Sequence, residues 1–325
     1  MSLLVEEIMT LLARDSQGTI NQRSRVSRYV DVGFKWLTGF FAIAVGLTLL
    51  AIALQVANQS WPAIREFGLS FLTSGTWNPV ADQYGAWPAI YGTLVSSFLA
   101  LLMALPIGVG VALFLSEDFL PSRIQQPLVF LIELLAAIPS VVYGLWGIFV
   151  LIPLLSKLGL WLHQNLGWVP FFSTPPRGPG MYVASVILAI MILPIIAAIS
   201  RDALVAVPSE LRQAAYGLGA TRWETILKVI LPSAFSGIVG GTMLGLGRAL
   251  GETMAVTMVI GNANTVSPSI FSPATTIASL LANQFAEASG LQISSLMYTA
   301  LILFGLTLIV NILAEVLVRT MRQRL

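Results

Sequence analysis

The chain has 325 residues, of which 56% are hydrophobic and only 10% are charged, and its mean hydropathy is +0.85. A water-soluble domain carries about 25% charged residues, so this composition excludes an ordinary soluble protein. The net charge of +2 does not indicate nucleic-acid binding, because the basic residues follow membrane topology instead. Without cysteine we expect no disulfide and no thiolate metal site, and the lone His163, with no carboxylates nearby, is a poor metal ligand. No nucleophile–base pair appears in the apolar runs, so we expect no catalytic site.

Uncharged apolar runs predict six membrane-spanning helices, each long enough to cross a hydrocarbon core of about 30 Å. The expected fold class is therefore an all-α integral membrane protein. The predicted spans are 36–56, 89–115, 128–155, 180–200, 233–260 and 293–315. We expect kinks within the spans at Pro106, Pro139, Pro153 and Pro194.

Lysine and arginine set the orientation of these spans. With both termini in the cytoplasm, the external segments hold only Arg65, Lys157 and Arg177 of the 17 basic side chains, and Arg248 lies within a span. We therefore predict a cytoplasmic segment over 1–35, a six-span domain over 36–318 and a cytoplasmic tail over 319–325. The first 15 residues are compatible with a short amphipathic helix, and the polar loop 261–292 predicts a short helix over 274–287.

A polar, part-basic insert at 201–232 separates the fourth and fifth spans. Pro208 and Ser209 predict a helix start with Ser209 as the N-cap, and Leu211, Ala214, Ala215 and Leu218 share one face of that helix. Gly217 and Gly219 are expected to end it. Thr221 and Glu224 fit a capping box that starts a second helix. An ordinary solvated loop with these caps is the alternative interpretation.

The spacing of residues in this insert resembles the EAA loop of ABC importer permeases. The matching residues are Ala214, Ala215, Gly219, Leu231 and Pro232, while Gln213 stands where the loop usually has glutamate. In that family the loop docks on an ATPase subunit. The resemblance therefore implies that the loop over 209–231, with Gln213, Ala214, Ala215, Gly217, Gly219, Leu231 and Pro232, couples this chain to an ATPase.

The sequence contains no phosphate-binding loop of the form Gly-x-x-x-x-Gly-Lys-Ser/Thr, because none of its lysines follows a glycine. We expect no cofactor on this chain, and ATP and Mg²⁺ are expected on a partner ATPase. Since one docking loop serves one protomer of an ATPase pair, a second permease chain is also expected.

Arg248 and Glu252 are charged residues inside the fifth predicted span. A charge at membrane depth costs at least about 2.5–3.5 kcal/mol, so such residues face a cavity or one another. In one interpretation they form a structural ion pair, since residues four apart share a helix face. In the other, Arg248 faces a translocation path, where its planar donors suit an oxyanion. The residues alone do not separate the two.

Three segments extend the resemblance to most of the chain. They are FLTSGTWNP at 71–79, IPSVVYGLWGIFVLIP at 138–153 and GRALGETMAVTMVIGN at 247–262. Together they resemble the phosphate-specific permeases of bacterial ABC importers, of the PstC type, which have the type I importer architecture. The resemblance implies an inner-membrane location, a substrate path with Arg248, Glu252 and Thr253, and no enzyme activity on this chain. It also implies three partners: a PstA-like second permease, a PstB-like ATPase dimer and a PstS-like phosphate-binding protein outside the membrane.

Two other functions remain open from the sequence. The chain could serve an importer of another oxyanion, such as sulfate, molybdate or phosphonate, which competition for uptake would reveal. A secondary transporter driven by an ion gradient would instead work without any ATPase, and is expected to show paired, interrupted halves that this sequence lacks.

Overall fold

The structure is a computed structural model that describes residues 25–117 and 119–322. The chain divides into two compact units, Met1–Gln55 and Val56–Leu325. The described part of the first unit is helical and forms the beginning of α2 (Arg25–Phe67). The amphipathic helix predicted over the first 15 residues lies outside the described residues.

The described part of the chain is almost entirely helical, which confirms the all-α prediction. The helices of the second unit are α3 (Trp87–Ser116), α4 (Ser122–Ala136), α5 (Ser140–Trp146), α6 (Ile152–Leu166), α7 (Met181–Val205), α8 (Ser209–Gly217), α9 (Arg222–Thr225), α10 (Leu231–Gly251), α11 (Met254–Val259), α12 (Ile277–Gln284) and α13 (Leu291–Arg322). Two π-helical segments, Gly147–Leu151 and Ile226–Ile230, join α5 to α6 and α9 to α10. Short 3-10 turns occupy Gly68–Leu72, Pro79–Ala81 and Pro170–Phe172.

Six helical stretches of the described chain are long and apolar enough to cross a membrane. They are Val32–Leu72, Trp87–Ser116, Ser140–Leu166, Met181–Val205, Arg222–Gly251 and Leu291–Thr320. The number of spans agrees with the sequence prediction, and the second, fourth and sixth spans lie where the apolar runs place them.

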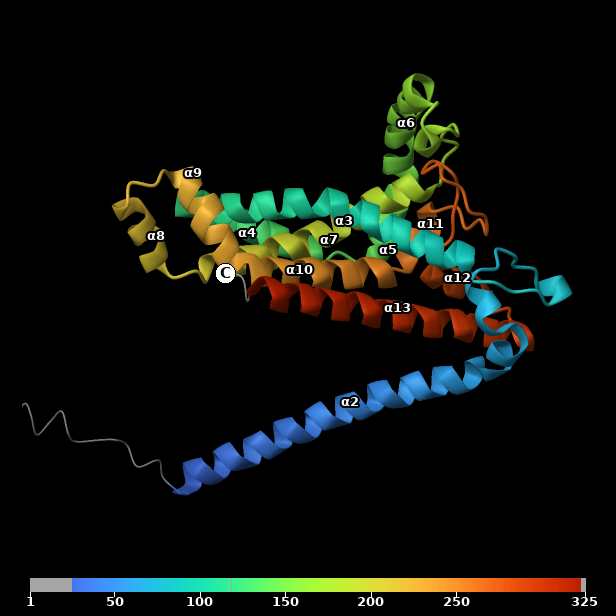
Figure 1. Ribbon diagram of the computed structural model, residues 1–325, viewed down its shortest axis with the longest axis horizontal. Helices are drawn as coiled ribbons and strands as arrows, with labels where there is room; N and C mark the ends of the chain where they lie inside the picture. The colour runs from blue at the N-terminus through green and yellow to red at the C-terminus, as the bar shows by residue number, and fades with distance from the viewer. Residues whose placement is uncertain (1–24, 118, 323–325) are drawn as a thin grey trace, which may run out of the picture. The chain divides into compact units, whose positions relative to one another are not determined.

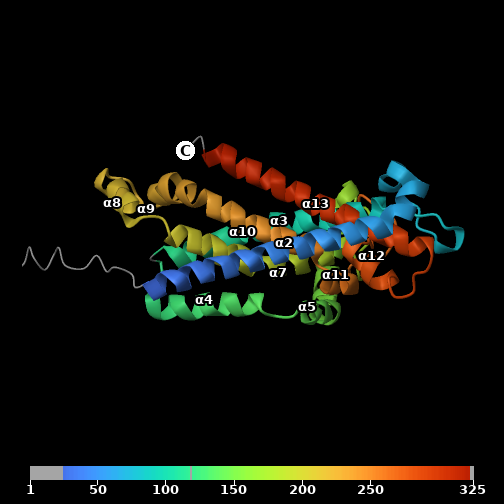
Figure 2. The same cartoon turned by 90° about the horizontal axis from the view of Figure 1, so that it is seen from below.

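Within the second unit, α7 is the central helix and packs against α3, α4 and α10 (Figure 1). α13 runs beside α10, and α8 and α9 lie at one end of this bundle while α11 and α12 lie at the other (Figures 1 and 2). Several large side chains of α7, among them Ile187, Ile192 and Ile196, are fully buried. An apolar helix that is buried on most sides in this way becomes the scaffold against which the other spans are positioned.

The prediction of one continuous third span over 128–155 is wrong. α4 ends at Ala136, and a new helix begins at Ser140, after Pro139. Pro139 lacks the N–H that would bond to the carbonyl oxygen of Leu135 four residues earlier. The hydroxyl of Tyr143 donates to that carbonyl instead, at 3.0 Å. The same carbonyl also accepts from the backbone N–H of Ile138 at 3.4 Å, so the freed acceptor keeps hydrogen bonds at the break.

The fifth span also differs from its prediction over 233–260. Its helical stretch begins at Arg222, α10 ends at Gly251, and the chain restarts as α11 at Met254. α11 packs closely on α5, since a Cβ atom at Gly144 would lie 3.3 Å from the Cα of Ala255. A straight continuation of α10 would not make this contact.

The loop between the last two spans contains the short helix that the sequence predicts. α12 lies inside the predicted range 274–287, and its start carries a capping box between Thr276 and Ser279. The backbone N–H of Ile277 also donates to the hydroxyl of Thr93 on α3, at 2.9 Å. This contact fixes α12 against the end of the bundle.

Candidate functional site

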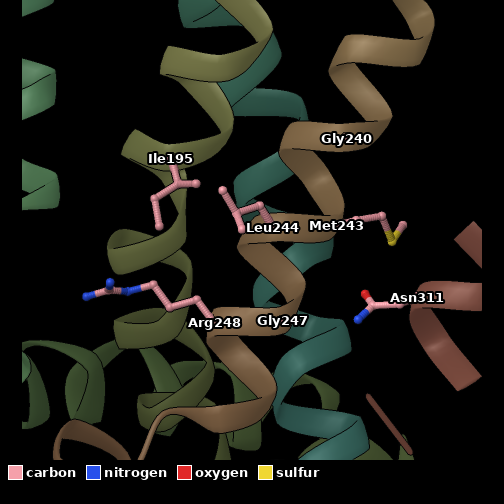
Figure 3. Close-up of a pocket in the computed structure, with 7 residues that line it drawn as sticks. All are labelled: Ile195, Gly240, Met243, Leu244, Gly247, Arg248 and Asn311. Atoms are coloured by element: carbon pink, nitrogen blue, oxygen red, sulfur yellow. The ribbon is translucent and has the colours of Figure 1, made fainter. Parts of the chain in front are cut away.

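Arg248 lies near the end of α10 and lines a cavity of about 570 Å³. Three helices contribute to this cavity, namely α7, α10 and α13. Its lining residues are Ile195, Gly240, Met243, Leu244, Gly247, Arg248 and Asn311 (Figure 3). Arg248 is therefore the charged residue in a lining that is otherwise apolar or neutral.

Within the described residues, Arg248 makes no ion pair and no hydrogen bond to another group, and its side chain is exposed. In Figure 3 it leaves α10 on the side opposite to Asn311, with its guanidinium pointing away from that amide. A guanidinium that is not held by the protein keeps its donors available for another acceptor. The structural ion pair with Glu252, one of the two interpretations of the sequence, is not formed in this structure.

Glu252 lies just beyond the end of α10, where the backbone turns extended, and it is 9% exposed. The assumption that it shares a helix face with Arg248 fails because the helix has already ended. Its carboxylate instead accepts a hydrogen bond from the backbone N–H of Ala255 at 3.2 Å, in the first turn of α11. Thr253 occupies the N-cap position of α11, and its carbonyl accepts from Thr257. Glu252 and Thr253 thus build the junction of the two helices.

The glycines of α10 fall on two faces with different surroundings. A Cβ atom at Gly237, Gly241 or Gly245 would meet side chains of α7 at 2.3–3.0 Å. A Cβ atom added at Gly240 or Gly247 would have no heavy atom within 4 Å, and both glycines line the cavity beside Arg248. One glycine face therefore allows α10 to approach α7, while the other leaves space at the arginine.

The loop between α7 and α10 has the predicted helix–glycine–helix form. α8 ends at Gly217, and Gly219 adopts φ +84°, the left-handed region that favours glycine. Thr221 and Glu224 make the predicted capping box, since the N–H of Thr221 donates to the Glu224 carboxylate at 3.0 Å and the N–H of Glu224 donates back at 3.4 Å. Pro208, however, occupies the N-cap position expected for Ser209 and offers no side-chain cap.

The same loop, from Ser209 to Leu231, presents apolar side chains outward. Leu218 is 90% exposed and Trp223 is 60% exposed, while Ala215 is buried against the rest of the protein. Gln213 and Ala214 are exposed on α8, and Leu231 and Pro232 begin α10 with partial burial. Large exposed apolar side chains clustered on one element are typical of an interaction surface.

Sequence reasoning missed the groups that hold this loop in place. Arg212 on α8 donates to the carboxylate of Glu117 at 3.1 Å, and Arg222 lies over the ring of Phe119 at 3.9 Å. Glu117 and Arg212 are 95 residues apart, and no local pattern connects them.

Comparison with known proteins identifies the family. Residues 104–323 match the family described as the binding-protein-dependent transport system inner membrane component. The chain is 46% identical over 319 residues to the phosphate transport system permease protein PstC of Pasteurella multocida, covering 97% of this chain and 99% of that protein. It is 47% identical over 300 residues to PstC of Haemophilus influenzae, covering 91% and 95%.

Solved structures support the fold. A bacterial ABC transporter that imports the acidic polysaccharide alginate matches with a TM-score of 0.54 and 19% identity, covering 90% of this chain and 98% of that one. The alginate transporter in complex with its periplasmic protein matches with a TM-score of 0.55, covering 88% and 95%. The architecture is thus that of ABC importer permeases. With both the sequence relatives and the fold in agreement, the chain belongs to the PstC family of phosphate transport permeases and is a multi-pass inner-membrane protein.

Proposed function

We propose that this chain forms, with a PstA-like second permease, the path by which an ATP-driven importer moves phosphate into the cell. Its identity of 46% to a phosphate transport permease over nearly the whole chain is the observation that carries the substrate assignment.

Arg248 is the residue that we assign to phosphate. Its planar guanidinium donates parallel hydrogen bonds that match the oxygens of a phosphate. Because it has no ion-pair partner within the described residues, its charge is available to the anion. Glu252 and Thr253 support the path from the junction of α10 and α11, and the buried Glu252 carboxylate is held by a backbone N–H.

The energy for transport must come from another chain under this proposal. No lysine of the sequence follows a glycine, so no phosphate-binding loop is available here for ATP. The exposed apolar side chains between Ser209 and Leu231 support docking of a PstB-like ATPase dimer on this loop. A PstS-like binding protein would deliver phosphate on the opposite side of the membrane.

The transport cycle follows from this arrangement. With both termini in the cytoplasm, closure of the ATPase pair moves the loop over 209–231 and opens the path to the loaded binding protein. Hydrolysis of ATP then returns the spans to the inward-facing state, and phosphate leaves Arg248 for the cytoplasm. A weak site suits this task, because tight binding of the anion would slow its release.

The test is purification followed by reconstitution. We expect the tagged chain to co-purify with a second permease and an ATPase, and the reconstituted complex to take up phosphate only with ATP and the binding protein. Excess sulfate, molybdate or phosphonate should not compete. Competition by one of these anions would transfer the assignment to that oxyanion, and uptake by this chain without an ATPase would refute the ATP-driven mechanism.

A further inference from the structure

Glu117 and Arg212 form an ion pair at the point where the loop between α7 and α10 meets the ends of two membrane helices. Glu117 follows the last residue of α3 and is 6% exposed, and the Arg212 side chain is 21% exposed. The Arg212 Nη2 atom lies 3.1 Å from Oε1 of Glu117. A pair this well shielded is much less screened by salt than an exposed one.

The same guanidinium also binds the end of α7. Its Nη2 donates to the carbonyl oxygen of Leu204 at 2.9 Å, and its Nη1 donates to that of Val207 at 2.8 Å. The last carbonyls of a helix have no partner within the helix, and a cation there also interacts favourably with the helix dipole. Arg212 thus connects α8 to the ends of both α3 and α7 through one planar group.

A second contact comes from the other helix of the loop. Arg222 lies 3.9 Å above the ring of Phe119, and Trp223 lies 5.8 Å from the same ring. The residues that follow α3 are therefore contacted by both α8 and α9. These contacts attach the loop to the membrane domain, while Leu218 of the same loop stays 90% exposed.

An unbroken stretch of α7 connects this attachment to the cavity of Arg248. Leu204 and Ile195 belong to α7, and Ile195 lines the cavity. The two residues are nine positions apart, which corresponds to roughly 13 Å of helix. α7 packs along α3, where a Cβ atom at Gly108 would lie 3.0 Å from Ile196. A displacement applied at the ends of α3 and α7 is thus carried along both.

We propose that the Glu117–Arg212 pair is the joint that transmits ATP-driven movement of the loop to α3 and α7. Both are positioning residues, since neither lies at the Arg248 cavity. The joint requires arginine, because the compact ammonium of lysine cannot direct planar donors at the Glu117 carboxylate and at the carbonyls of Leu204 and Val207 together. This inference rests on the proposed function, in which an ATPase drives the loop.

The experiment measures phosphate taken up per ATP hydrolysed by the reconstituted complex. In Arg212→Lys and Glu117→Gln we expect this ratio to fall about tenfold, the change that follows from losing one hydrogen bond to a charged group. The amount of assembled complex and the rate of ATP hydrolysis should stay near wild type. The matched control is the exposed Arg319–Glu315 pair on α13, where Arg319→Lys and Glu315→Gln should leave the ratio unchanged.

A second measurement uses the absence of cysteine from the natural chain. The double variant Glu117→Cys, Arg212→Cys should be uncoupled, and a short bifunctional thiol reagent should restore coupling. With partner subunits whose own cysteines have been replaced, the reagent should have no effect on either single variant or on the complex of the wild-type chain. A purely structural pair would instead lower assembly, uptake and hydrolysis in parallel, and the cross-link would not restore the ratio.

The outcomes separate the two proposals. If the wild-type complex takes up no phosphate, the proposed function fails. If the wild type is active but Arg212→Lys and Glu117→Gln keep its ratio of phosphate taken up to ATP hydrolysed, the joint is refuted and the proposed function stands. The same conclusion follows if the cross-linked double variant stays uncoupled.

Discussion

At the scale of single residues, Arg248 and Glu252 illustrate two ways to keep a charge at membrane depth. Glu252 is buried and its carboxylate accepts a hydrogen bond from the N–H of Ala255. Arg248 is exposed to a cavity of about 570 Å³ and is not neutralised by a neighbour in the described chain. A charge that a protein leaves unpaired at this depth needs water or an anion as its partner. The different surroundings of the two residues lead to different predictions.

Replacement of Arg248 by glutamine should abolish transport without affecting assembly. The loss of hydrogen bonds to a charged group lowers phosphate uptake by at least about tenfold, and no described contact within the chain is lost. Arg248→Lys should be intermediate, because it keeps the charge but not the planar donors. Uptake is measured in a strain without another phosphate importer, with the exposed Arg123→Gln on α4 as the control. Wild-type uptake by Arg248→Gln would exclude this residue from the path.

Replacement of Glu252 tests its role at the helix junction. Glu252→Ala removes the acceptor for the Ala255 N–H, and loss of a side-chain cap costs about 0.5–2 kcal/mol of stability. Glu252→Gln keeps an acceptor oxygen, so its thermal unfolding midpoint should lie closer to wild type. Equal midpoints for Glu252→Ala and wild type, measured on the purified protein in detergent, would show that the cap contributes no stability.

At the scale of secondary-structure elements, the sequence correctly predicts the helix starts and ends that depend only on residues close together in the chain. The Thr221–Glu224 capping box and the glycine end of α8 are local, and both agree with prediction. The break at Pro139 is harder to locate, because proline within a span is tolerated as a kink and the Tyr143 contact decides the outcome. The end of α10 at Gly251 depends on packing of α11 against α5, which no apolar run reveals.

Gly217 and Gly219 allow a matched test of the loop. Both have no heavy atom within 4 Å of an added Cβ atom, but only Gly219 of the two has a positive φ. Gly219→Ala should cost roughly 1–2 kcal/mol, because an L-residue is strained in this region. Gly217→Ala should be neutral or stabilising by about 0.5–1 kcal/mol, since alanine favours a helix.

Hydrogen–deuterium exchange over residues 214–220 measures this difference. A local loss of 1.4 kcal/mol corresponds to about tenfold faster exchange, so Gly219→Ala should exchange faster than wild type and Gly217→Ala should not. Similar exchange in the two variants would mean that the left-handed turn does not limit the stability of the loop.

At the scale of the whole molecule, the site depends on contacts between distant segments. The sequence singles out Arg248 by its charge alone, and the resemblance to phosphate permeases supplies its role. The cavity beside it requires Ile195 from α7 and Asn311 from α13, which the sequence does not bring together. The attachment of the loop through Glu117 is equally non-local. Local chemistry thus indicates which residues carry function, and tertiary packing decides what surrounds them.

α10 connects α7 to the cavity beside Arg248, because one face of α10 packs on α7 and another face borders the cavity. Gly237→Ala places a Cβ atom 2.3 Å from that of Ala203, so the helices must separate, and overpacking of this kind costs about 1–3 kcal/mol. Gly247→Ala introduces the same methyl group where no atom lies within 4 Å, and the thermal unfolding midpoint of the purified protein should not fall.

A larger side chain separates packing from transport. Gly247→Leu should leave the unfolding midpoint near wild type but reduce phosphate uptake, because its bulk enters the space beside Arg248 or the surface available to the second permease. Co-purification of that permease distinguishes the two causes, since only the second would lower its recovery. If Gly247→Leu supports full uptake, this face of α10 neither borders the path nor contacts the partner. A lower midpoint in Gly247→Ala than in Gly237→Ala would reverse the assignment of the two glycine faces.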